Sequence, residues 1–190
     1  AVMIVAGLGV VPISRRVAPH LVVPIGLAFS VAGYLIVAFT THEHGVAPLI
    51  IAFVVLGIGI GAAETISNEL ILSSAPAEKA GAASAVSETA YELGAVLGTA
   101  VLGGIITAFY RAAIVLPAGL PTETADAARE TLAGAYTASN ELSGALGDEL
   151  WQAAADAFGS GVFITSLIGA GLVVVAGVIA AVTLRTRTPR

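Results

Sequence analysis

Long runs of apolar residues alternate with short polar segments along this 190-residue chain. Residues 21–40 carry no charged side chain, and at a rise of 1.5 Å per residue this run can cross a hydrocarbon core about 30 Å thick. Three further runs of spanning length follow at residues 48–72, 80–110 and 157–184. The pattern predicts four transmembrane helices and hence an all-α fold, a polytopic transmembrane helix bundle.

The first residues, 1–11, are also apolar, but the run is only about half the roughly 20 residues that a spanning helix needs. It lacks the basic start and the small-residue cleavage site of a secretory signal peptide. We therefore expect residues 1–11 to be the end of a transmembrane helix that begins outside this chain, and the chain to be part of a longer protein.

Proline and clustered polar residues mark the ends of the predicted spans. Pro48 stands where the first turn of a helix tolerates proline, whereas Pro76 in the segment SSAPAEKA is too costly for a helix interior. The segments expected outside the hydrocarbon core are therefore the loops at 12–20, 41–47, 73–79 and 111–156 and a tail at 185–190.

The loop at 111–156 is long enough to have a structure of its own. Leu142, Leu146 and Leu150 recur every four residues, with Trp151 beside the last of them. This spacing predicts a short amphipathic helix within a packed loop, with Trp151 as an anchor at the membrane interface.

The positions of Lys and Arg predict the topology, because short loops rich in these residues stay in the cytoplasm. If the four spans alternate, one side receives Arg15, Arg16, Lys79, Arg185, Arg187 and Arg190. The other side receives only Arg111 and Arg129, both in the long loop, where the rule has least force. The C-terminus is therefore expected in the cytoplasm. The long loop is expected to be an acidic external segment, with Glu123, Asp126, Glu130, Glu141, Asp148, Glu149 and Asp156.

Composition supports a membrane protein and excludes several other classes. Hydrophobic residues make up 57% of the chain and charged residues 11%, against about 25% charged in a typical soluble domain. The chain has no cysteine and no basic patch, so neither a disulfide framework nor a nucleic-acid partner is expected. Its three histidines, at positions 20, 42 and 44, form no metal-binding pattern. We expect no cofactor, no metal and no enzyme activity.

Glu88 and Glu92 lie inside the third predicted span, four residues apart. On a helix they project from nearly the same face, one turn apart. Two ionised carboxylates placed in this way in a low dielectric repel each other, so at least one is expected to hold its proton near neutral pH. Acids inside a membrane are costly and usually line a pathway, so we interpret this pair as a site of proton exchange.

Glu64 invites the same interpretation, with Asn68 one helical turn away. Glu64 lies about eight residues before the end of its helix, and Glu88 about eight after the next helix begins, so both lie roughly 12 Å from the cytoplasmic edge. A shared polar site is geometrically possible, although Glu64 can equally face a helix outside this chain. Small residues suggest close helix packing, at Gly94 and Gly98 in the third span and at Gly57, Gly59 and Gly61 in the second.

The run KAGAASAVSETAYELGAVLGTAVLGG resembles the penultimate helix of the fourteen-helix drug/proton antiporters of the major facilitator superfamily, the Qac-type exporters. Glu88-Thr89, Glu92-Leu93-Gly94 and the stretch from Gly94 to Ala100 match the motif of that helix. Ser87 departs from it, because some relatives have an additional acid or Asn there, which leaves the number of coupled protons open. Tyr110-Arg111 and the long loop that follows are also similar to this family. GVVPISRRV resembles its cytoplasmic turn only weakly, with Ile13-Ser14 in place of an acid.

The resemblance implies export of lipophilic cationic compounds across the cell membrane in exchange for protons at Glu88 and Glu92. It implies as partners the membrane lipid, the other half of the same transporter, protons and a small lipophilic substrate. In that fold the helix from Pro48 would line the central cavity. Two alternatives stay open, a carrier of an endogenous metabolite or lipid and a membrane-anchoring or assembly module that transports nothing. The paired acids argue against the module, because an anchor gains nothing from them.

Overall fold

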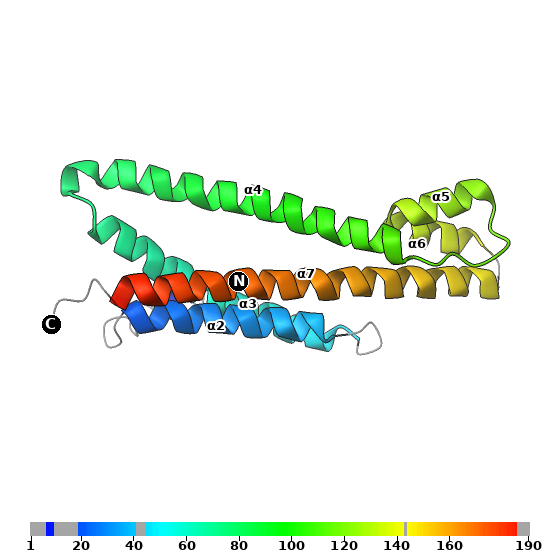
Figure 1. The fold of residues 1–190 in the computed structure, drawn as a ribbon, viewed down its shortest axis with the longest axis horizontal. Helices are drawn as coiled ribbons and strands as arrows, with labels where there is room; N and C mark the ends of the chain where they lie inside the picture. Colours follow the sequence, from blue (N-terminus) through cyan, green and yellow to red (C-terminus); the bar gives the residue numbers. More distant parts are fainter. Residues whose placement is uncertain (1–6, 10–18, 41–44, 143, 186–190) are drawn as a thin grey trace. The chain divides into compact units, whose positions relative to one another are not determined.

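The computed structural model describes residues 7–9, 19–40, 45–142 and 144–185. Its elements are helical, and no strand occurs among these residues (Figure 1). In chain order they are α2 (Pro19–Ala38), α3 (Ala47–Ser73), the 3-10 helix η2 (Ala77–Lys79), α4 (Ala80–Ala113), α5 (Thr122–Glu130), α6 (Leu132–Glu141) and α7 (Ala145–Arg185). The all-α fold class is confirmed. Residues 7–9 are helical, and residues 19–20 of the loop expected at 12–20 belong to α2. The rest of the segments expected at 1–11 and 12–20, residues 41–44 and the end of the tail lie outside the described residues.

Four helices are long and apolar enough to cross a membrane, and they span Leu21–Ala38, Ala47–Ser73, Ala77–Ala113 and Ala145–Leu184. The ends of α2, α3 and α4 lie within three residues of the boundaries expected from the sequence. As expected, Pro48 stands in the first turn of α3. Pro76 precedes η2, which leads directly into α4.

The fourth long helix differs from its prediction. The sequence pattern ended the long loop at 156, whereas α7 begins at Ala145 and is 41 residues long. Gly144, with φ of +70°, makes the turn before α7, and no proline interrupts the helix after it. Leu146 and Leu150 therefore belong to the first turns of α7 and not to a separate amphipathic helix. An acidic residue such as Asp156 lowers hydropathy without breaking a helix, so hydropathy alone placed this boundary too late.

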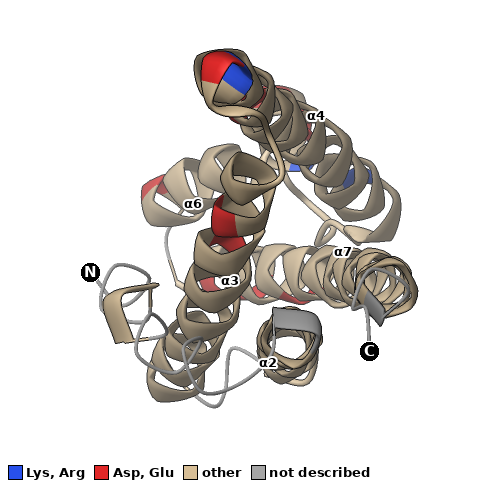
Figure 2. Cartoon of the chain, turned by 90° about the vertical axis from the view of Figure 1, so that its left-hand side faces the viewer, with Lys and Arg blue, Asp and Glu red and all other residues tan. Residues whose placement is uncertain are grey.

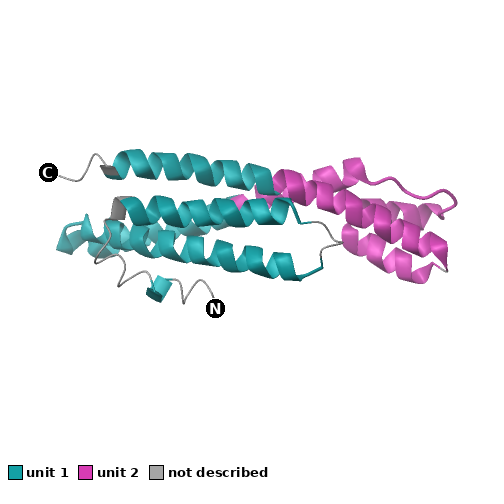
Figure 3. Cartoon of the chain, turned by 90° about the horizontal axis from the view of Figure 1, so that it is seen from below, with its two compact units in different colours: residues 1–40, 45–97, 166–190 teal, residues 41–44, 98–165 magenta. Residues whose placement is uncertain are grey.

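The chain divides into two compact units, coloured separately in Figure 3. Unit 1 comprises residues 1–40, 45–97 and 166–190, and unit 2 comprises 41–44 and 98–165. Unit 1 therefore contains α2, α3, the first half of α4 and the second half of α7. Unit 2 contains α5 and α6 with the remaining halves of α4 and α7.

In unit 1 the closest helix contact joins α2 to α3. A Cβ added to Gly59 would lie 2.5 Å from the carbonyl oxygen of Gly26 and 2.6 Å from the backbone nitrogen of Ser30. A Cβ on Gly33 would meet the Leu56 side chain at 2.5 Å. Small residues thus bring the two backbones together, which gives the van der Waals contact that holds helices in a bilayer.

A second contact in unit 1 is apolar and involves three helices. Val22 and Val23 of α2 and Ile66 of α3 are buried together. Hydrophobic side chains that pack against them come from the same helices and from the end of α7, namely Leu27, Ala62, Leu70, Ala180 and Leu184. α7 also approaches α2 at Gly169, where an added Cβ would lie 3.0 Å from the ring of Tyr34.

Unit 2 has its own hydrophobic core, which explains the leucine pattern of the long loop. The buried members are Tyr110, Ile114, Ala128, Ala135, Ala138, Leu150, Ala154 and Ala157. Leu142 packs against this core, and Trp151 makes an edge-to-face contact with Tyr136 at a ring-centroid distance of 5.4 Å. The segment after α4 is therefore a packed helical structure.

Two side chains at the end of α4 satisfy the last carbonyls of α5. The buried Tyr110 hydroxyl donates a hydrogen bond to the backbone oxygen of Ala128 at 2.6 Å, and Arg111 Nε donates to the backbone oxygen of Glu130 at 3.2 Å. The last four carbonyls of a helix have no intrahelical partner. These two bonds therefore fix α5 to α4 within unit 2.

We predict that Tyr110→Phe loosens unit 2, because it leaves the buried carbonyl of Ala128 without its donor. Such a loss costs about 1–3 kcal/mol of local stability. Amide hydrogen exchange of α5 should become faster, while exchange in α2 and α3 stays unchanged. Tyr136→Phe, at an exposed tyrosine of the same unit, is the matched control. Equal protection of α5 in the two variants would contradict the prediction.

Candidate functional site

The polar residues of α3 lie on the face opposite its contact with α2. The buried positions of α3 are Ala52, Leu56, Gly59, Gly61, Ala63 and Ile66. Glu64 and Asn68, one turn apart, are both exposed and share their strip of the helix with the exposed Ile60. Figure 2 shows the acidic positions along α3 and α4. The face of α3 that α2 leaves uncovered thus carries a carboxyl and an amide.

Glu88 and Glu92 lie on the uninterrupted helix α4, one turn apart, and both side chains are exposed in this chain. The helix continues through both positions because the segment from Ala80 to Ala113 contains no proline. The geometry that the spacing predicted, two carboxyls on one face of one helix, is therefore present.

Tyr91 lies on α4 between Glu88 and Glu92 along the chain, one helical turn after Ser87. Ser87 is buried, and its Oγ has no hydrogen-bond partner among the described residues. The predicted site residues thus lie on two helices, Glu64 and Asn68 on α3 and Glu88 and Glu92 on α4, and no described hydrogen bond joins them.

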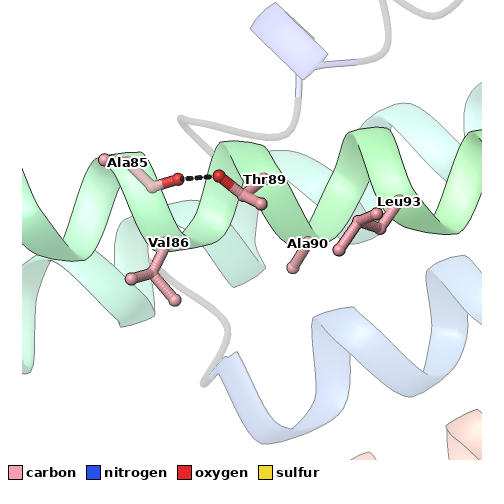
Figure 4. Close-up of a pocket in the computed structure, with 5 residues that line it drawn as sticks. All are labelled: Ala85, Val86, Thr89, Ala90 and Leu93. Atoms are coloured by element: carbon pink, nitrogen blue, oxygen red, sulfur yellow. Dashed lines mark hydrogen bonds between the residues drawn. The ribbon is translucent and has the colours of Figure 1, made fainter.

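A shallow hollow lies along α4 (Figure 4). Its lining is almost wholly apolar and comes from Ala85, Val86, Thr89, Ala90 and Leu93. Thr89 Oγ1 donates to the backbone oxygen of Ala85 at 2.8 Å, so its hydroxyl proton is engaged within the helix. Residues three apart on a helix are neighbours, which places Glu88 and Glu92 at the edge of this apolar surface.

The predicted packing glycines fall into two groups. Gly61 is buried on α3, and its carbonyl accepts a hydrogen bond from Thr65 Oγ1 at 2.8 Å, while Gly57 is partly buried. Gly94 and Gly98 on α4 have no heavy atom within 4 Å of an added Cβ in the part of the chain that the structure describes. Any packing at these two therefore involves helices beyond that part.

Sequence reasoning missed two features of this region. It counted Gly59 among three similar glycines, whereas Gly59 makes the closest contact with α2. It treated Ser87 only as a departure from a motif and did not predict that its hydroxyl is buried without a hydrogen-bond partner among the described residues.

The side chains of this region suit the binding of cations and protons. Carboxylates accept hydrogen bonds when ionised and donate one when protonated, and hydroxyl and amide groups do both. Among the described residues, no group of three or more His, Asp or Glu is arranged to hold a metal ion. The described groups can therefore exchange protons and neutralise a positive charge beside an apolar surface.

Comparison with known proteins places this geometry in context. Residues 1–122 match the family described as Major Facilitator Superfamily. The chain is 46% identical over 184 residues to the multidrug efflux pump LfrA of Mycolicibacterium smegmatis, with 97% of this chain and 36% of LfrA covered. It is 39% identical over 103 residues to the methyl viologen resistance protein SmvA of Salmonella typhimurium, with 54% of this chain and 21% of SmvA covered. The chain spans about a third of the length of LfrA.

Proposed function

The chain belongs to the major facilitator superfamily, and on this basis we propose that it forms part of a transporter that exports lipophilic cations in exchange for protons. In this proposal Glu88 and Glu92 exchange protons for substrate, and Glu64 and Asn68 extend the polar site onto α3. Helices from the rest of the transporter enclose these residues, and membrane lipid surrounds the bundle.

The similarity to efflux proteins supports the export of drugs. LfrA is named a multidrug efflux pump and aligns with nearly the whole of this chain. SmvA is named a methyl viologen resistance protein, and methyl viologen is an aromatic dication. A substrate of that kind would need negative charge beside an apolar surface. Glu88 and Glu92 lie in such an arrangement, at the edge of the apolar hollow of α4.

The single observation that carries the proposal is the placement of acids on the exposed faces of two apolar helices. Glu88 and Glu92 share one face of α4, and Glu64 lies on the face of α3 away from α2. A charge at the centre of a bilayer costs at least a few kcal/mol. Acids kept at such positions are explained by proton and cation movement and not by anchoring.

Transport by the full-length protein in proteoliposomes tests this function. We expect an imposed proton gradient to drive accumulation of tetraphenylphosphonium, a monovalent lipophilic cation, or of methyl viologen. Collapse of the gradient with a protonophore should abolish the accumulation. Movement of both probes that does not depend on the gradient would argue for the alternative of a metabolite or lipid carrier. Absence of any transport would argue for the anchoring module.

The transporter is proposed to lie in the cell membrane with the C-terminus of this chain in the cytoplasm. We predict that a cysteine at Lys79, introduced into a cysteine-free background, reacts only with membrane-permeant thiol reagents in intact cells. A cysteine at Glu130 in the long loop should react with impermeant reagents as well. The basis is the excess of Lys and Arg on one side of the spans. Labelling of position 79 from outside would reverse this topology.

A further inference from the structure

The helices of unit 2 contact one another in a closed ring, α4 to α5, α5 to α6, α6 to α7 and α7 back to α4. The first contact consists of the two hydrogen bonds from the end of α4 to the last carbonyls of α5. In the second, a Cβ added to Gly134 of α6 would collide with the carbonyl oxygen of Ala127 in α5. In the third, a Cβ added to Gly147 of α7 would lie 2.5 Å from the carbonyl oxygen of Ser139 in α6. Each contact joins a helix to the backbone of the next one.

Gly161 of α7 closes the ring and is buried. A Cβ added to it would lie 3.1 Å from the carbonyl oxygen of Ile106 and 3.5 Å from the Cβ of Phe109, both on α4. The hydrophobic core of unit 2 takes buried residues from all four helices (Figure 3). The parts of α4 and α7 that belong to unit 2 are therefore joined twice, directly and through α5 and α6.

The earlier part of α4 has much less contact with the described residues. Its hydrophobic side chains at Val86, Leu93, Val96 and Leu97 are 57–71% exposed, whereas Tyr110 in unit 2 is 2% exposed. Helices α4 and α7 are 34 and 41 residues long, well beyond the roughly 20 residues that cross a hydrocarbon core. Both helices therefore continue past the hydrocarbon core, and unit 2 holds them together where they do so.

We propose that unit 2 is a clamp that keeps its parts of α4 and α7 at a fixed separation while the transporter changes conformation. This inference rests on the proposed function, and it concerns the helix that carries Glu88 and Glu92. Inside a bilayer, helices lack a hydrophobic driving force for association. Where they continue into water, burial of apolar side chains supplies that force. The clamp thus fixes one end of α4 and allows its membrane part to repack against other helices.

A disulfide across the contact between α7 and α4 tests whether the clamp stays closed. The chain has no cysteine, and the 3.5 Å from an added Cβ at Gly161 to the Cβ of Phe109 suits a disulfide. We expect Phe109→Cys/Gly161→Cys, in a full-length transporter without other cysteines, to cross-link completely with or without substrate and proton gradient. Tetraphenylphosphonium uptake should be the same in the oxidised and the reduced form. Cross-linking that decreases when substrate or gradient is present, or uptake that is lost on oxidation and restored by a reductant, would overturn the clamp.

Gly147→Val opens the ring between α6 and α7 and tests whether transport needs the clamp. The added side chain meets the backbone oxygen of Ser139, which no rotamer change can move away. We expect about ten-fold lower uptake, the scale of an overpacked contact. Adding the oxidised Phe109→Cys/Gly161→Cys pair should restore most of the uptake, and a reductant should remove it again. Gly159→Val is the matched control on α7, because Gly159 is exposed and has no heavy atom within 4 Å of an added Cβ among the described residues.

Normal uptake by Gly147→Val, or no recovery with the disulfide, would overturn the clamp and leave the proposed function intact. If Gly147→Val does not yield folded protein, Tyr110→Phe opens the ring more gently between α4 and α5, and the same loss and recovery are expected in smaller measure. Absence of proton-driven uptake in the wild type would instead overturn the proposed function. The extent of cross-linking with and without an imposed gradient, measured by labelling of the remaining thiols, tests the clamp in that case as well.

Discussion

Glu88→Gln in the full-length transporter is expected to abolish uptake driven by a proton gradient, or to reduce it by at least two orders of magnitude. Gln keeps the size and much of the hydrogen-bonding capacity of Glu but can neither release a proton nor neutralise a cation. The substitution therefore separates charge from packing. Because Glu88 is exposed on α4 in this chain, loss of helix contacts within the chain cannot account for the effect. The measurement is tetraphenylphosphonium uptake against pH in proteoliposomes.

Glu69→Gln is the matched control, since Glu69 is an exposed acid near the end of α3 that is not assigned to the site. It should retain normal uptake. Equal losses in both variants would indicate a general effect of removing negative charge. Normal coupling in Glu88→Gln would move the site to Glu64 or to the rest of the transporter.

Glu92→Gln should impair transport less than Glu88→Gln and should change the preference between the monovalent tetraphenylphosphonium and the divalent methyl viologen. Glu88-Thr89 is the closer match to the antiporter motif, which is why Glu88 ranks first. If the two carboxyls titrate as a pair, removing one of them changes the pH dependence of transport that the remaining carboxyl produces. An unchanged profile in the double Gln variant would mean that these acids are structural.

The helices and the family could be predicted from this sequence, because both depend on local features. Hydrophobic runs fix where a helix can cross a bilayer, and the motif around Glu88 and Glu92 lies within a single helix. The start of α7 could not be found in this way. The acids Asp148, Glu149 and Asp156 lower hydropathy without ending the helix. The low hydropathy of this stretch therefore indicated polar residues and not a loop.

The candidate site was predictable only within one helix. The spacing of Glu88 and Glu92 follows from the helical period, so their shared face needed no structure. Whether Glu64 faces Glu88 depends on how α3 and α4 meet, and spacing along the chain does not contain that information. The sequence could not identify Gly59 as the contact glycine either, because only the crossing with α2 distinguishes one glycine of a cluster from another.

That crossing leads to a second large expected effect, in which Gly59→Ala prevents the normal packing of α2 on α3. In a helix interior, Gly→Ala alone favours the helix by roughly 0.5–1 kcal/mol. Here the added Cβ would lie 2.5 Å from the Gly26 oxygen, 2.5 Å from Ser30 Oγ and 2.6 Å from the Ser30 nitrogen. Two of these atoms are backbone, so no rotamer change relieves the contact. The two helices have to separate, and an overpacked contact costs about 1–3 kcal/mol.

The expected result is a lower yield of monodisperse protein in detergent and a lower melting temperature, measured by heating followed by size-exclusion chromatography. Gly81→Ala is the matched control, because Gly81 has no heavy atom within 4 Å of an added Cβ among the described residues. A Gly59→Ala/Ser30→Gly double variant should remain destabilised, since removing the Ser30 side chain leaves both backbone contacts. Full rescue by that second substitution would show that the Ser30 hydroxyl, and not the approach of the backbones, sets the limit at this crossing.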